Sequence, residues 1–333
     1  MNDSSFSSNV DPFRNLEVLE SQIVRWWDGP DRLSSICRYA LLPPGKMFRP
    51  VLLVEAGLAV GGELDHLLPA AVGTEFGHVA SLIHDDIIDH DDFRRGRPSV
   101  HAQHGLANAI LSGDALFFSL FEGLVRCHRN GAPAEAVVAA LDVVTEVGVA
   151  LCRGQMREDE ITGDLNADPD DYRTVIQLKT ASLFRGACGS GAILGGGDAE
   201  QIQALERYGE SLGMAFQLVD DLLPYTSSRE TTGKPLESDI RNKRITLPIL
   251  ETYRLADAGQ RRLIEGIFGA TDPDEDDARR IRVLVHSVGA VDSVAKHALA
   301  EAEEARNALV VLPNSGSKAI LERFVELAIL RLA

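Results

Sequence analysis

The chain has 333 residues, of which 45% are hydrophobic, enough to build one large core or two ordinary ones. Its 33 basic and 50 acidic residues give a formal net charge of −17. This charge argues against a nucleic-acid-binding surface or an anionic membrane face, since both require basic patches. A small polyanionic substrate would therefore need local basic groups or metal ions.

The cysteines and the N-terminal residues point to a cytoplasmic protein. The four cysteines lack CxxC spacing, so they indicate neither a zinc site nor a disulfide framework. The first residues show no basic segment followed by an apolar one, and no run of about 18 apolar residues occurs, so neither a secretory leader nor a transmembrane segment is predicted. Residues 1–11 are polar and Ser/Asn-rich, and we expect them to be disordered.

From residue 12 onward the hydrophobic pattern is helical. Leu16, Leu19, Ile23 and Trp26 recur at three- and four-residue spacing and predict an amphipathic first helix. After the break PPGKMF, the pair Arg49-Pro50 opens an apolar helix that runs to residue 59. Further helices are expected over 69–90, 113–127, 134–156, 172–194 and 199–223.

The breaks between these helices also have recognisable chemistry. The cluster beginning at Asp168 is typical of a helix N-cap, the three glycines at 195–197 stop a helix, and Pro224 is expected to end another. The polar stretch 226–244 is a loop that we expect to cover a site. After Thr246 the chain returns to helix, apart from an acidic loop at 271–277. With no strand pattern and no linker, the prediction is one all-α domain over residues 12–333.

The stretch HDDIIDHDDFRRGRP at 84–98 follows an apolar helical run and concentrates acidic and basic residues. On a helix, Asp85 and Asp89 share a face with Asp86 beside them, and such like charges repel unless cations neutralise them. Asp220-Asp221 likewise ends an apolar helical run, FQLVDDLL. Mg²⁺ prefers oxygen ligands, and helical bundles build metal sites from facing helices, so these aspartates are candidate metal ligands. The alternative, a solvated acidic helix face, is disfavoured by the apolar residues before both pairs.

Several basic residues lie beside glycine or proline breaks or follow the acidic stretch, and these are candidates for binding phosphate oxygens. They are Lys46, Arg49, Arg94, Arg95, Lys179, Lys234 and Lys243. Each of them could instead be a solvated surface charge. Lys179 and Thr180 lie inside an apolar helix, where satisfied polar groups are the alternative, and His78 lies two turns before Asp85, where a core histidine is the alternative. No GxSxG, GxxxxGK[ST] or HExxH motif and no GxGxxG after a strand is present.

From residue 43 to residue 248 the chain resembles the trans-isoprenyl diphosphate synthases, also called polyprenyl synthetases. The resemblance lies in ordered motifs: GKMFRP at 45–50, HDDIIDHDDFRRGRP at 84–98, GQ at 154–155, LKT at 178–180, FQLVDD at 216–221, GKPLESD at 233–239 and KRITLP at 243–248. It implies an all-α isoprenoid synthase fold, a helical bundle around a central cavity with the aspartate motifs on opposite walls, in a cytoplasmic homodimer.

The resemblance also implies a Mg²⁺-dependent prenyltransferase that condenses isopentenyl diphosphate with an allylic diphosphate. Three Mg²⁺ ions would join the allylic diphosphate to Asp85, Asp89 and Asp220, with Asp86 and Asp221 completing the two motifs. The implied ligands of that diphosphate are Arg94, Lys179, Lys234 and Lys243, and those of isopentenyl diphosphate are Lys46, Arg49, His78 and Arg95, with Gly45 allowing close backbone approach. Oxygens of Thr180 and Gln217 would stabilise the allylic cation.

Two departures from the family pattern stand out. Pro224 occupies the place of a third aspartate in the second motif, which bears on the third metal, and Met47-Phe48 replaces a basic-aliphatic pair. We expect activity to be retained. The alternatives are a farnesyl diphosphate synthase, a class I terpene cyclase and a non-catalytic partner subunit, although a cyclase would need only one diphosphate site.

Product length in such enzymes is expected to depend on the residues one turn before Asp85. Ala80 and Ser81, five and four residues before it, are both small, so products of C20 or longer are predicted from C5 to C15 starters. Phe117, Phe118 and Phe121 are candidates for a deeper floor, or ordinary core aromatics.

Overall fold

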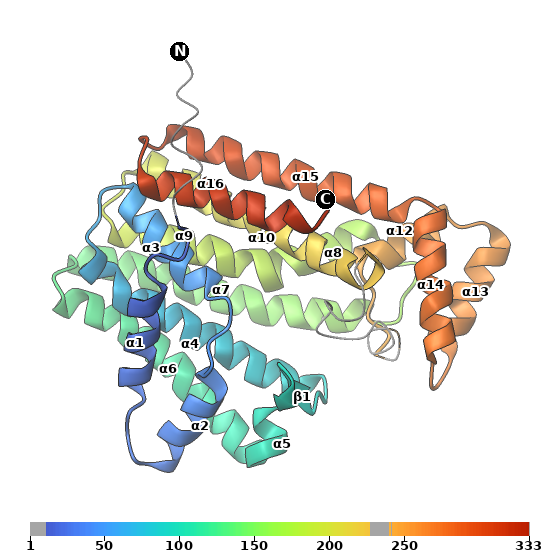
Figure 1. Ribbon diagram of the computed structural model, residues 1–333, viewed down its shortest axis with the longest axis horizontal. Helices are drawn as coiled ribbons and strands as arrows, with labels where there is room; N and C mark the ends of the chain where they lie inside the picture. The colour runs from blue at the N-terminus through green and yellow to red at the C-terminus, as the bar shows by residue number, and fades with distance from the viewer. Residues whose placement is uncertain (1–10, 227–239, 241, 333) are drawn as a thin grey trace. The chain divides into compact units, whose positions relative to one another are not determined.

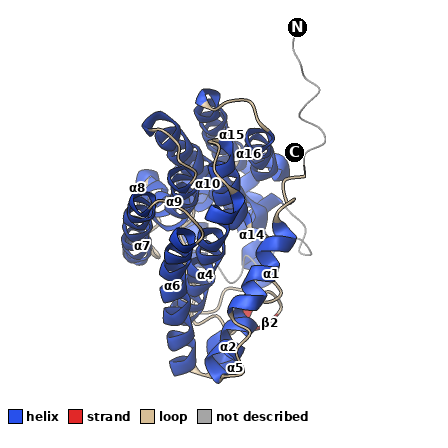
Figure 2. Ribbon diagram, turned by 90° about the vertical axis from the view of Figure 1, so that its left-hand side faces the viewer, coloured by secondary structure: helices blue, strands red, loops and turns tan. Residues whose placement is uncertain are grey.

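The computed structural model describes residues 11–226, 240 and 242–332, and helices dominate it (Figures 1 and 2). The helices are α1 (Leu16–Trp26), α2 (Arg32–Leu41), α3 (Phe48–Ala59), α4 (Leu64–Ile88), α5 (Val100–His104), α6 (Leu106–Arg129), α7 (Ala134–Ile161), α8 (Pro169–Ile176), the π-helical turn η1 (Gln177–Ala181), α9 (Ser182–Leu194), α10 (Ala199–Thr226), α12 (Leu247–Leu255), α13 (Ala258–Gly269), α14 (Glu275–Ser287), α15 (Ala290–Ala308), α16 (Gly316–Ile329), and the 3₁₀ turns η2 (Leu309–Val311) and η3 (Leu330–Leu332). The two strands, β1 (Phe93–Arg94) and β2 (Arg97–Pro98), form one short antiparallel hairpin. The predicted all-α fold is therefore confirmed.

The chain divides into two compact units, and each is described by itself. Unit 1 comprises Met1–Thr145, Phe184–Arg207 and Ala308–Arg323, and unit 2 comprises Glu146–Leu183, Tyr208–Asn307 and Phe324–Ala333. The single synthase domain expected over residues 12–333 stays a prediction. The disorder expected for residues 1–10 falls outside the described residues, and the carbonyl of Asp11 accepts a hydrogen bond of 3.3 Å from the backbone N–H of Arg14.

In unit 1 the central helix is α4, which packs against α3 and runs beside α6 (Figures 1 and 2). Its buried residues include Val72, Phe76 and Ile83. Glycines bring α4 and α6 close together, since a Cβ at Gly123 would lie 2.5 Å from the carbonyl oxygen of Pro69. Such small residues allow backbones to approach, and the approach fixes how α6 lies beside the acidic end of α4.

Unit 2 has its own hydrophobic core. Its buried side chains come from α8, α10, α12, α14 and α15 and include Leu218, Leu222, Ile249, Ile281 and Val294. Polar caps define where some of these helices begin: the Asp168 side chain accepts a hydrogen bond of 2.9 Å from the backbone N–H of Asp170, as the N-cap prediction required.

Several predicted boundaries were wrong for identifiable reasons. Helix α2 was not predicted, and α4 and α6 begin at Leu64 and Leu106, earlier than expected. Helix α10 continues through Pro224 to Thr226, since a proline in the last turn removes only one helical hydrogen bond. The hairpin escaped prediction because strands of two residues cannot show an alternating pattern.

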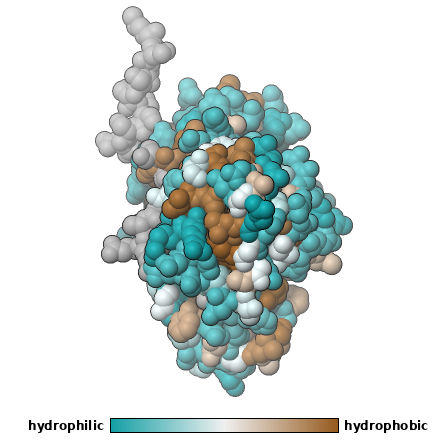
Figure 3. Space-filling model, turned by 90° about the vertical axis from the view of Figure 1, so that its right-hand side faces the viewer, coloured by the Kyte–Doolittle hydropathy of each residue, from teal (hydrophilic) through white to brown (hydrophobic). Residues whose placement is uncertain are grey.

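Much of the surface visible in Figure 3 is hydrophilic, with hydrophobic side chains gathered in patches. Within the described part of the chain, α6 is the one helix long and apolar enough to cross a membrane by length and composition, and 39% of its apolar window is buried. The core helix of a soluble protein meets the same criteria. Since α6 packs along α4, we interpret it as a core helix with one exposed side.

Candidate active site

The first acidic cluster lies at the end of α4 in unit 1. Asp85 and Asp89 are partly exposed, and the backbone N–H of Asp89 donates to the carbonyl of Asp85 over 2.8 Å, so the two residues are one helical turn apart as predicted. Asp86, in contrast, is only 2% exposed. The two carboxylates at the ends of the motif are thus the accessible ones.

Asp86 is held by Arg94. The Nε atom of Arg94 lies 2.7 and 2.8 Å from the two carboxylate oxygens of Asp86, and Nη2 lies 2.5 Å from Oδ1. Burial acts to lower the pKa of Arg94, but the hydrogen bond and negative charge of Asp86 outweigh it and raise the pKa. Asp86 therefore has both oxygens occupied by a permanent cation. Its assignment as a metal ligand, and that of Arg94 as a diphosphate ligand, stay predictions.

The hairpin formed by β1 and β2 directs the adjacent Arg94 and Arg95 to two different partners. Its two-residue loop, Arg95-Gly96, has positive φ angles of 52° and 76°, as a tight hairpin turn requires. Gly96 adopts this conformation readily, whereas Arg95 is strained there. While Arg94 binds Asp86, Arg95 reaches the loop before α3: a Cβ at Gly45 would lie 2.5 Å from Nη2 of Arg95. Glycine is the residue that allows this contact.

Tyr39 of α2 anchors the same hairpin. Its hydroxyl donates to the carbonyl of Pro98 over 2.6 Å, and its ring lies under the guanidinium of Arg97, 4.4 Å from the centroid. Arg97 also donates to the backbone carbonyl of Tyr39. These contacts offset the strain at Arg95 and keep the arginines in place. Sequence reasoning missed Tyr39, because no local pattern relates it to a loop 58 residues later.

The residues expected to hold the second diphosphate also come together in unit 1. Arg49, in the first turn of α3, lies over the ring of Phe184, 4.8 Å from its centroid. Lys46 is exposed, with Nζ 5.7 Å from the centroid of Phe48. The intervening Met47 has a φ of 54° and a buried side chain, so the chain turns sharply between the two cations.

Two ionisable side chains of α4 lie behind these cations. Burial lowers the pKa of His78 well below its usual value, and the charges of Arg49, Arg95 and Arg94 lower it further, so the imidazole is neutral. Burial raises the pKa of Glu75 to about 7, although Arg49 and Arg95 act in the opposite direction. Sequence reasoning missed Glu75, although a carboxylate three residues before His78 in an apolar helix was visible in the pattern.

In unit 2 the second acidic cluster is held by neutral groups. Asp221 is 8% exposed and accepts hydrogen bonds from the hydroxyl of Tyr172 (2.7 Å) and from Nε2 of Gln217 (2.8 Å). Thr180 in turn donates to Oε1 of Gln217 over 3.0 Å. Asp220 is partly exposed. The structure thus brings together Thr180, Gln217 and Asp221, and adds Tyr172, which sequence reasoning missed.

Lys179 and Thr180 lie in the π-helical turn η1, where one helical turn is widened. Such turns are frequent at functional sites because they redirect side chains. A Cβ at Gly154 would lie 2.8 Å from the backbone nitrogen of Lys179, so the glycine of the GQ motif lets α7 approach this turn. Lys179 forms an ion pair of 2.5 Å with Glu158 of α7.

Of the remaining predicted cations, the structure describes Lys243 but not Lys234. Lys243 is exposed, with a positive φ of 52°, and its carbonyl accepts a hydrogen bond of 3.0 Å from Gly163. Lys234 and most of the expected covering loop lie outside the described residues. Pro224 is part of α10, and its carbonyl accepts from Nε of Arg282 over 3.0 Å.

Near the expected product floor, Ala80 is fully buried and Ser81 is 7% exposed, with its hydroxyl donating to the carbonyl of His78 over 2.8 Å. Phe117 packs against the ring of His84 at 5.7 Å between centroids. Phe118 is 72% exposed, so it is not a core aromatic, and its assignment to a floor stays a prediction.

Each unit contains candidate metal ligands. Over residues 11–226, 240 and 242–332, no group of three or more His, Cys, Asp or Glu side chains is close enough to hold a metal ion. The accessible donors, Asp85, Asp89 and Asp220, are carboxylates, which suit a hard cation such as Mg²⁺. They fit a metal that is shared with an incoming polyanion and keeps part of its water shell.

Comparison with known proteins identifies the family. The polyprenyl synthetase family model matches residues 30–285. This chain belongs to the polyprenyl synthetase family. Among curated family members, the short chain isoprenyl diphosphate synthase of Methanothermobacter thermautotrophicus is 35% identical over 302 residues, 91% of each chain. The geranylgeranyl diphosphate synthase of Methanosarcina mazei is 34% identical over 303 residues, 91% of this chain and 90% of that one.

Solved structures of family members have the same fold. Geranylgeranyl pyrophosphate synthetase from Pyrococcus horikoshii superposes with a TM-score of 0.88 at 32% identity, covering 96% of each chain. Polyprenyl synthase from Caulobacter crescentus, complexed with calcium and isoprenyl diphosphate, gives a TM-score of 0.87 at 31% identity, covering 97% of this chain and 98% of that one. The predicted isoprenoid synthase fold and prenyl diphosphate synthase activity class are therefore confirmed.

Proposed function

We propose that this enzyme condenses isopentenyl diphosphate with an allylic diphosphate starter to give a trans-polyprenyl diphosphate of C20 or longer. The proposal rests on the two adjacent arginines of the β1–β2 hairpin, Arg94 and Arg95, which have different partners. Arg94 is directed to Asp86 in the acidic cluster and Arg95 to the Gly45 loop, which supports two separate anion sites. Two diphosphate sites are what a condensation needs and what a terpene cyclase does not.

In this proposal the two substrates are bound by separate sets of cations. Arg94, Lys179, Lys234 and Lys243 bind the allylic diphosphate, and Lys46, Arg49, Arg95 and neutral His78 bind isopentenyl diphosphate. Fixing both reactants removes much of the entropic barrier to a bimolecular step. When bound at Asp85, Asp89 and Asp220, about three Mg²⁺ ions would supply Lewis-acid stabilisation of the departing diphosphate.

The chain's own groups then direct the reaction. As the allylic C–O bond breaks, the arginine and lysine side chains donate hydrogen bonds to the leaving diphosphate. The oxygens of Thr180 and Gln217 stabilise the allylic cation, and their mutual hydrogen bond orients them. The double bond of isopentenyl diphosphate attacks this carbon, and the released diphosphate accepts the proton lost in the last step.

The test is product analysis of the purified protein alone, with isopentenyl diphosphate and C5, C10, C15 or C20 allylic starters. With Mg²⁺ we expect elongation of farnesyl diphosphate to at least C20, and with excess EDTA we expect none. Elongation that requires an added partner protein would contradict the proposal, as would a product that stops at C15.

Chain length provides a sharper test. Ala80 is fully buried, and a phenyl ring introduced there would occupy the space that we assign to the growing chain. Ala80→Phe should therefore shorten the main product by one or two C5 units, whereas Val310→Ala, which changes a side chain that is 75% exposed, should not. Unchanged products from Ala80→Phe would contradict the assignment of the floor.

We further propose that the enzyme is a homodimer formed through α6. Leu111, Phe118 and Val125 are 61%, 72% and 47% exposed and recur every seven residues, so they form one apolar stripe along the helix. A stripe of this kind can pair with its own copy about a two-fold axis. Sedimentation should show a dimer that Phe118→Glu dissociates, whereas a wild-type monomer that binds lipid vesicles would contradict this interface.

A cytoplasmic location is proposed on the state of the cysteines. All four are unpaired, and Cys37, Cys127 and Cys188 are buried. Burial raises the pKa of Cys37 and of Cys127 to about 12, which keeps these thiols protonated and unreactive. Free thiols are usual in a reducing compartment.

A further inference from the structure

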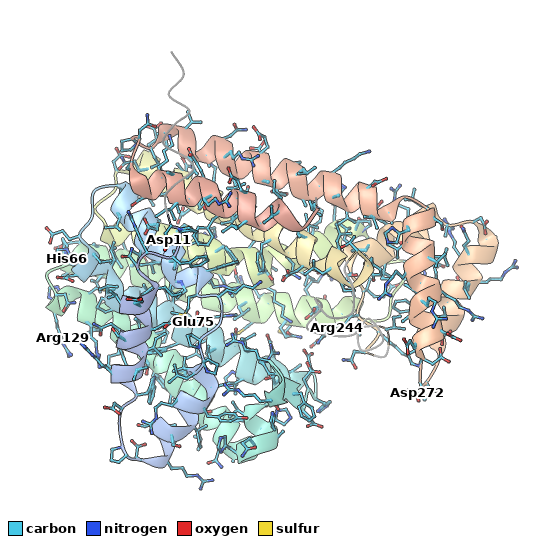
Figure 4. The ribbon with its side chains drawn as sticks, viewed as in Figure 1. Asp11, His66, Glu75, Arg129, Arg244 and Asp272 are labelled. Carbon is cyan, nitrogen blue, oxygen red and sulfur yellow. The ribbon has the colours of Figure 1, made fainter. Side chains whose placement is uncertain are left out.

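Residues 13–15, which lead into α1, contact α3 within unit 1, and the mechanism proposed so far does not use them. The backbone N–H of Phe13 donates to the carboxylate of Asp11 over 2.9 Å, which fixes the start of this segment. In Figure 4, Asp11 is drawn over the helices of unit 1, whereas His66 and Arg129 mark its edge. The segment therefore runs across unit 1 and does not lead away from it.

The first contact is an ion pair with a buried carboxylate, Glu55 of α3. The Nε and Nη2 atoms of Arg14 lie 3.1 and 2.7 Å from the two carboxylate oxygens of Glu55, so the pair is bidentate. The side chain of Glu55 is 0% exposed and that of Arg14 is 40% exposed, so the cation reaches in from the surface. Because a buried carboxylate needs a paired charge, Glu55 ties the segment to α3.

Two neutral side chains extend this contact. Nδ2 of Asn15 donates to Oε1 of Glu55 over 3.0 Å, and Nη2 of Arg14 donates to the hydroxyl of Ser317 in α16, also over 3.0 Å. Asn15 occupies the N-cap position of α1 but makes no side-chain cap hydrogen bond there. Asparagine is among the preferred N-cap residues, so its side chain binds Glu55 in place of the helix end.

The second contact lies on the same side of α3, two turns nearer its N-terminus. The ring of Phe13 stacks on that of Phe48, with 6.0 Å between the centroids and 23° between the planes. Phe48 precedes Glu55 by seven residues, so both side chains lie on one side of the helix. Phe48 also belongs to the Met47-Phe48 pair in which this chain departs from the family pattern, and the stacking gives that departure a structural role.

The end of α3 that Phe13 contacts carries the cations assigned to isopentenyl diphosphate. Nζ of Lys46 lies 5.7 Å from the centroid of Phe48, a cation–π distance, and Arg49 follows Phe48 in the first turn of the helix. The N-cap residue, Met47, has a positive φ of 54° and makes no side-chain cap hydrogen bond. The stacked rings thus support a helix end that its own N-cap side chain does not hold.

We propose that Phe13 and Arg14 are positioning residues of the second diphosphate site, where they hold the GKMFRP loop and the first turn of α3 in place before isopentenyl diphosphate binds. This inference rests on the proposed function of that site. Groups that are already held in the bound arrangement lose less conformational freedom on binding, which increases affinity. The cations assigned to the allylic diphosphate lie on other segments, so affinity for that substrate should not depend on residues 13–15.

The first experiment measures the KM of the full chain for isopentenyl diphosphate and for farnesyl diphosphate, each with the other substrate and Mg²⁺ at saturation. Phe13→Ala removes the stacked ring and should raise the KM for isopentenyl diphosphate about fivefold, the order expected for one aromatic pair. The KM for farnesyl diphosphate and kcat should stay at the wild-type values. Phe13→Trp, which keeps an aromatic ring, should restore part of the affinity.

A double-mutant cycle tests whether Phe13 acts through Phe48. Phe48→Leu alone should raise the same KM, and adding Phe13→Ala to it should raise the KM little further, because the partner ring is already absent. Additive effects of the two substitutions would show that Phe13 does not act through α3, and they would overturn the inference.

Arg14 is tested against a comparable ion pair in unit 2. Arg254→Ala removes an arginine that donates over 2.9 Å to Glu251, a carboxylate that is 5% exposed. Arg14→Ala and Arg254→Ala should both lower the midpoint of thermal unfolding, but only Arg14→Ala should raise the KM for isopentenyl diphosphate. Arg14→Lys, which keeps the charge, should restore part of the affinity. If Arg14→Ala does not fold, Arg14→Lys and Phe13→Ala decide, since neither removes the cation.

Three results would overturn the inference while leaving the proposed function intact. They are an unchanged KM for isopentenyl diphosphate in folded Phe13→Ala, an equal rise in the KM for both substrates, and an equal rise in Arg254→Ala. Failure of wild type to elongate any allylic starter would overturn both the inference and the proposed function.

Discussion

The two acidic clusters look alike in sequence, but the structure holds them by different chemistry. In each pair the second aspartate is buried and anchored: Asp86 by the cation Arg94, and Asp221 by the neutral donors Tyr172 and Gln217. The first aspartate of each pair, Asp85 or Asp220, remains partly exposed. The two aspartates of a DD pair therefore differ in environment: the first is accessible, and the second is buried and anchors the helix end.

The difference between the anchors also has consequences for function. The Arg94–Asp86 pair has no net charge and can share its cation with a diphosphate. Asp221, in contrast, accepts hydrogen bonds from the uncharged side chains of Tyr172 and Gln217. We therefore expect the first cluster to be sensitive to loss of its cation and the second to be sensitive to metal concentration.

The largest effect is expected from the exposed aspartates. Asp85→Asn and Asp220→Asn should each lower kcat by about a thousandfold, equivalent to about 4 kcal/mol, because each removes a proposed metal ligand. Thermal unfolding should change little. The measurement is turnover at saturating Mg²⁺, with Asp65→Asn as the control. Normal turnover in Asp220→Asn would show that the second cluster is not a metal site.

Replacing Arg94, the charged partner of Asp86, should have the next largest effect. Arg94→Ala leaves the carboxylate of Asp86, 2% exposed, without its cation and should lower the free energy of unfolding by about 3 kcal/mol. Denaturant unfolding measures it. Arg306→Ala, which breaks an exposed pair with Glu303, should cost less than about 1 kcal/mol. Equal losses in the two variants would mean that the Asp86 anchor adds nothing to stability.

Replacing Tyr172, an uncharged hydrogen-bond partner of Asp221, should have a smaller effect on stability. Tyr172→Phe removes the hydrogen bond from the Tyr172 hydroxyl to Asp221 and should lower the free energy of unfolding by about 1–2 kcal/mol. In contrast, Tyr253→Phe removes a hydroxyl bonded to exposed Glu265 and should leave stability unchanged. A loss from Tyr172→Phe as large as that from Arg94→Ala would remove the distinction between the two anchors.

The smallest effect concerns the missing third aspartate. Pro224→Asp adds a carboxylate one turn after Asp220 and should lower the Mg²⁺ concentration for half-maximal activity by up to about tenfold, with kcat unchanged. Pro224→Ala separates the new carboxylate from the loss of proline. An unchanged Mg²⁺ requirement in a folded Pro224→Asp variant would mean that this position does not support the metal site.

Much of the fold could be predicted because the evidence for it is local. The spacing of Leu16, Leu19 and Ile23 predicted α1, and Asp168 was recognised as an N-cap from its side chain and its position. The same holds for the candidate ligands, since carboxylates and cations at fixed spacing identify a diphosphate and metal chemistry whatever surrounds them.

The remainder depended on contacts between distant residues. Thr180 was predicted to lie in an ordinary helix, whereas the helix widens there into a π-turn against Gly154 of α7. Glu75 lies in an apolar run of the sequence, and only the packing of α4 showed that its carboxylate is buried. Neither arrangement leaves a periodic trace in the sequence.

By itself, the sequence determined that this protein is helical, that it belongs with enzymes of diphosphate chemistry, and which residues carry the charges. Only the tertiary structure decided which aspartate of each pair is buried, that Arg94 pairs with Asp86 while Arg95 contacts the Gly45 loop, and that Glu75 is buried. The physical reason is that helix periodicity and residue chemistry are local properties, whereas burial and charge pairing arise when separate segments pack together.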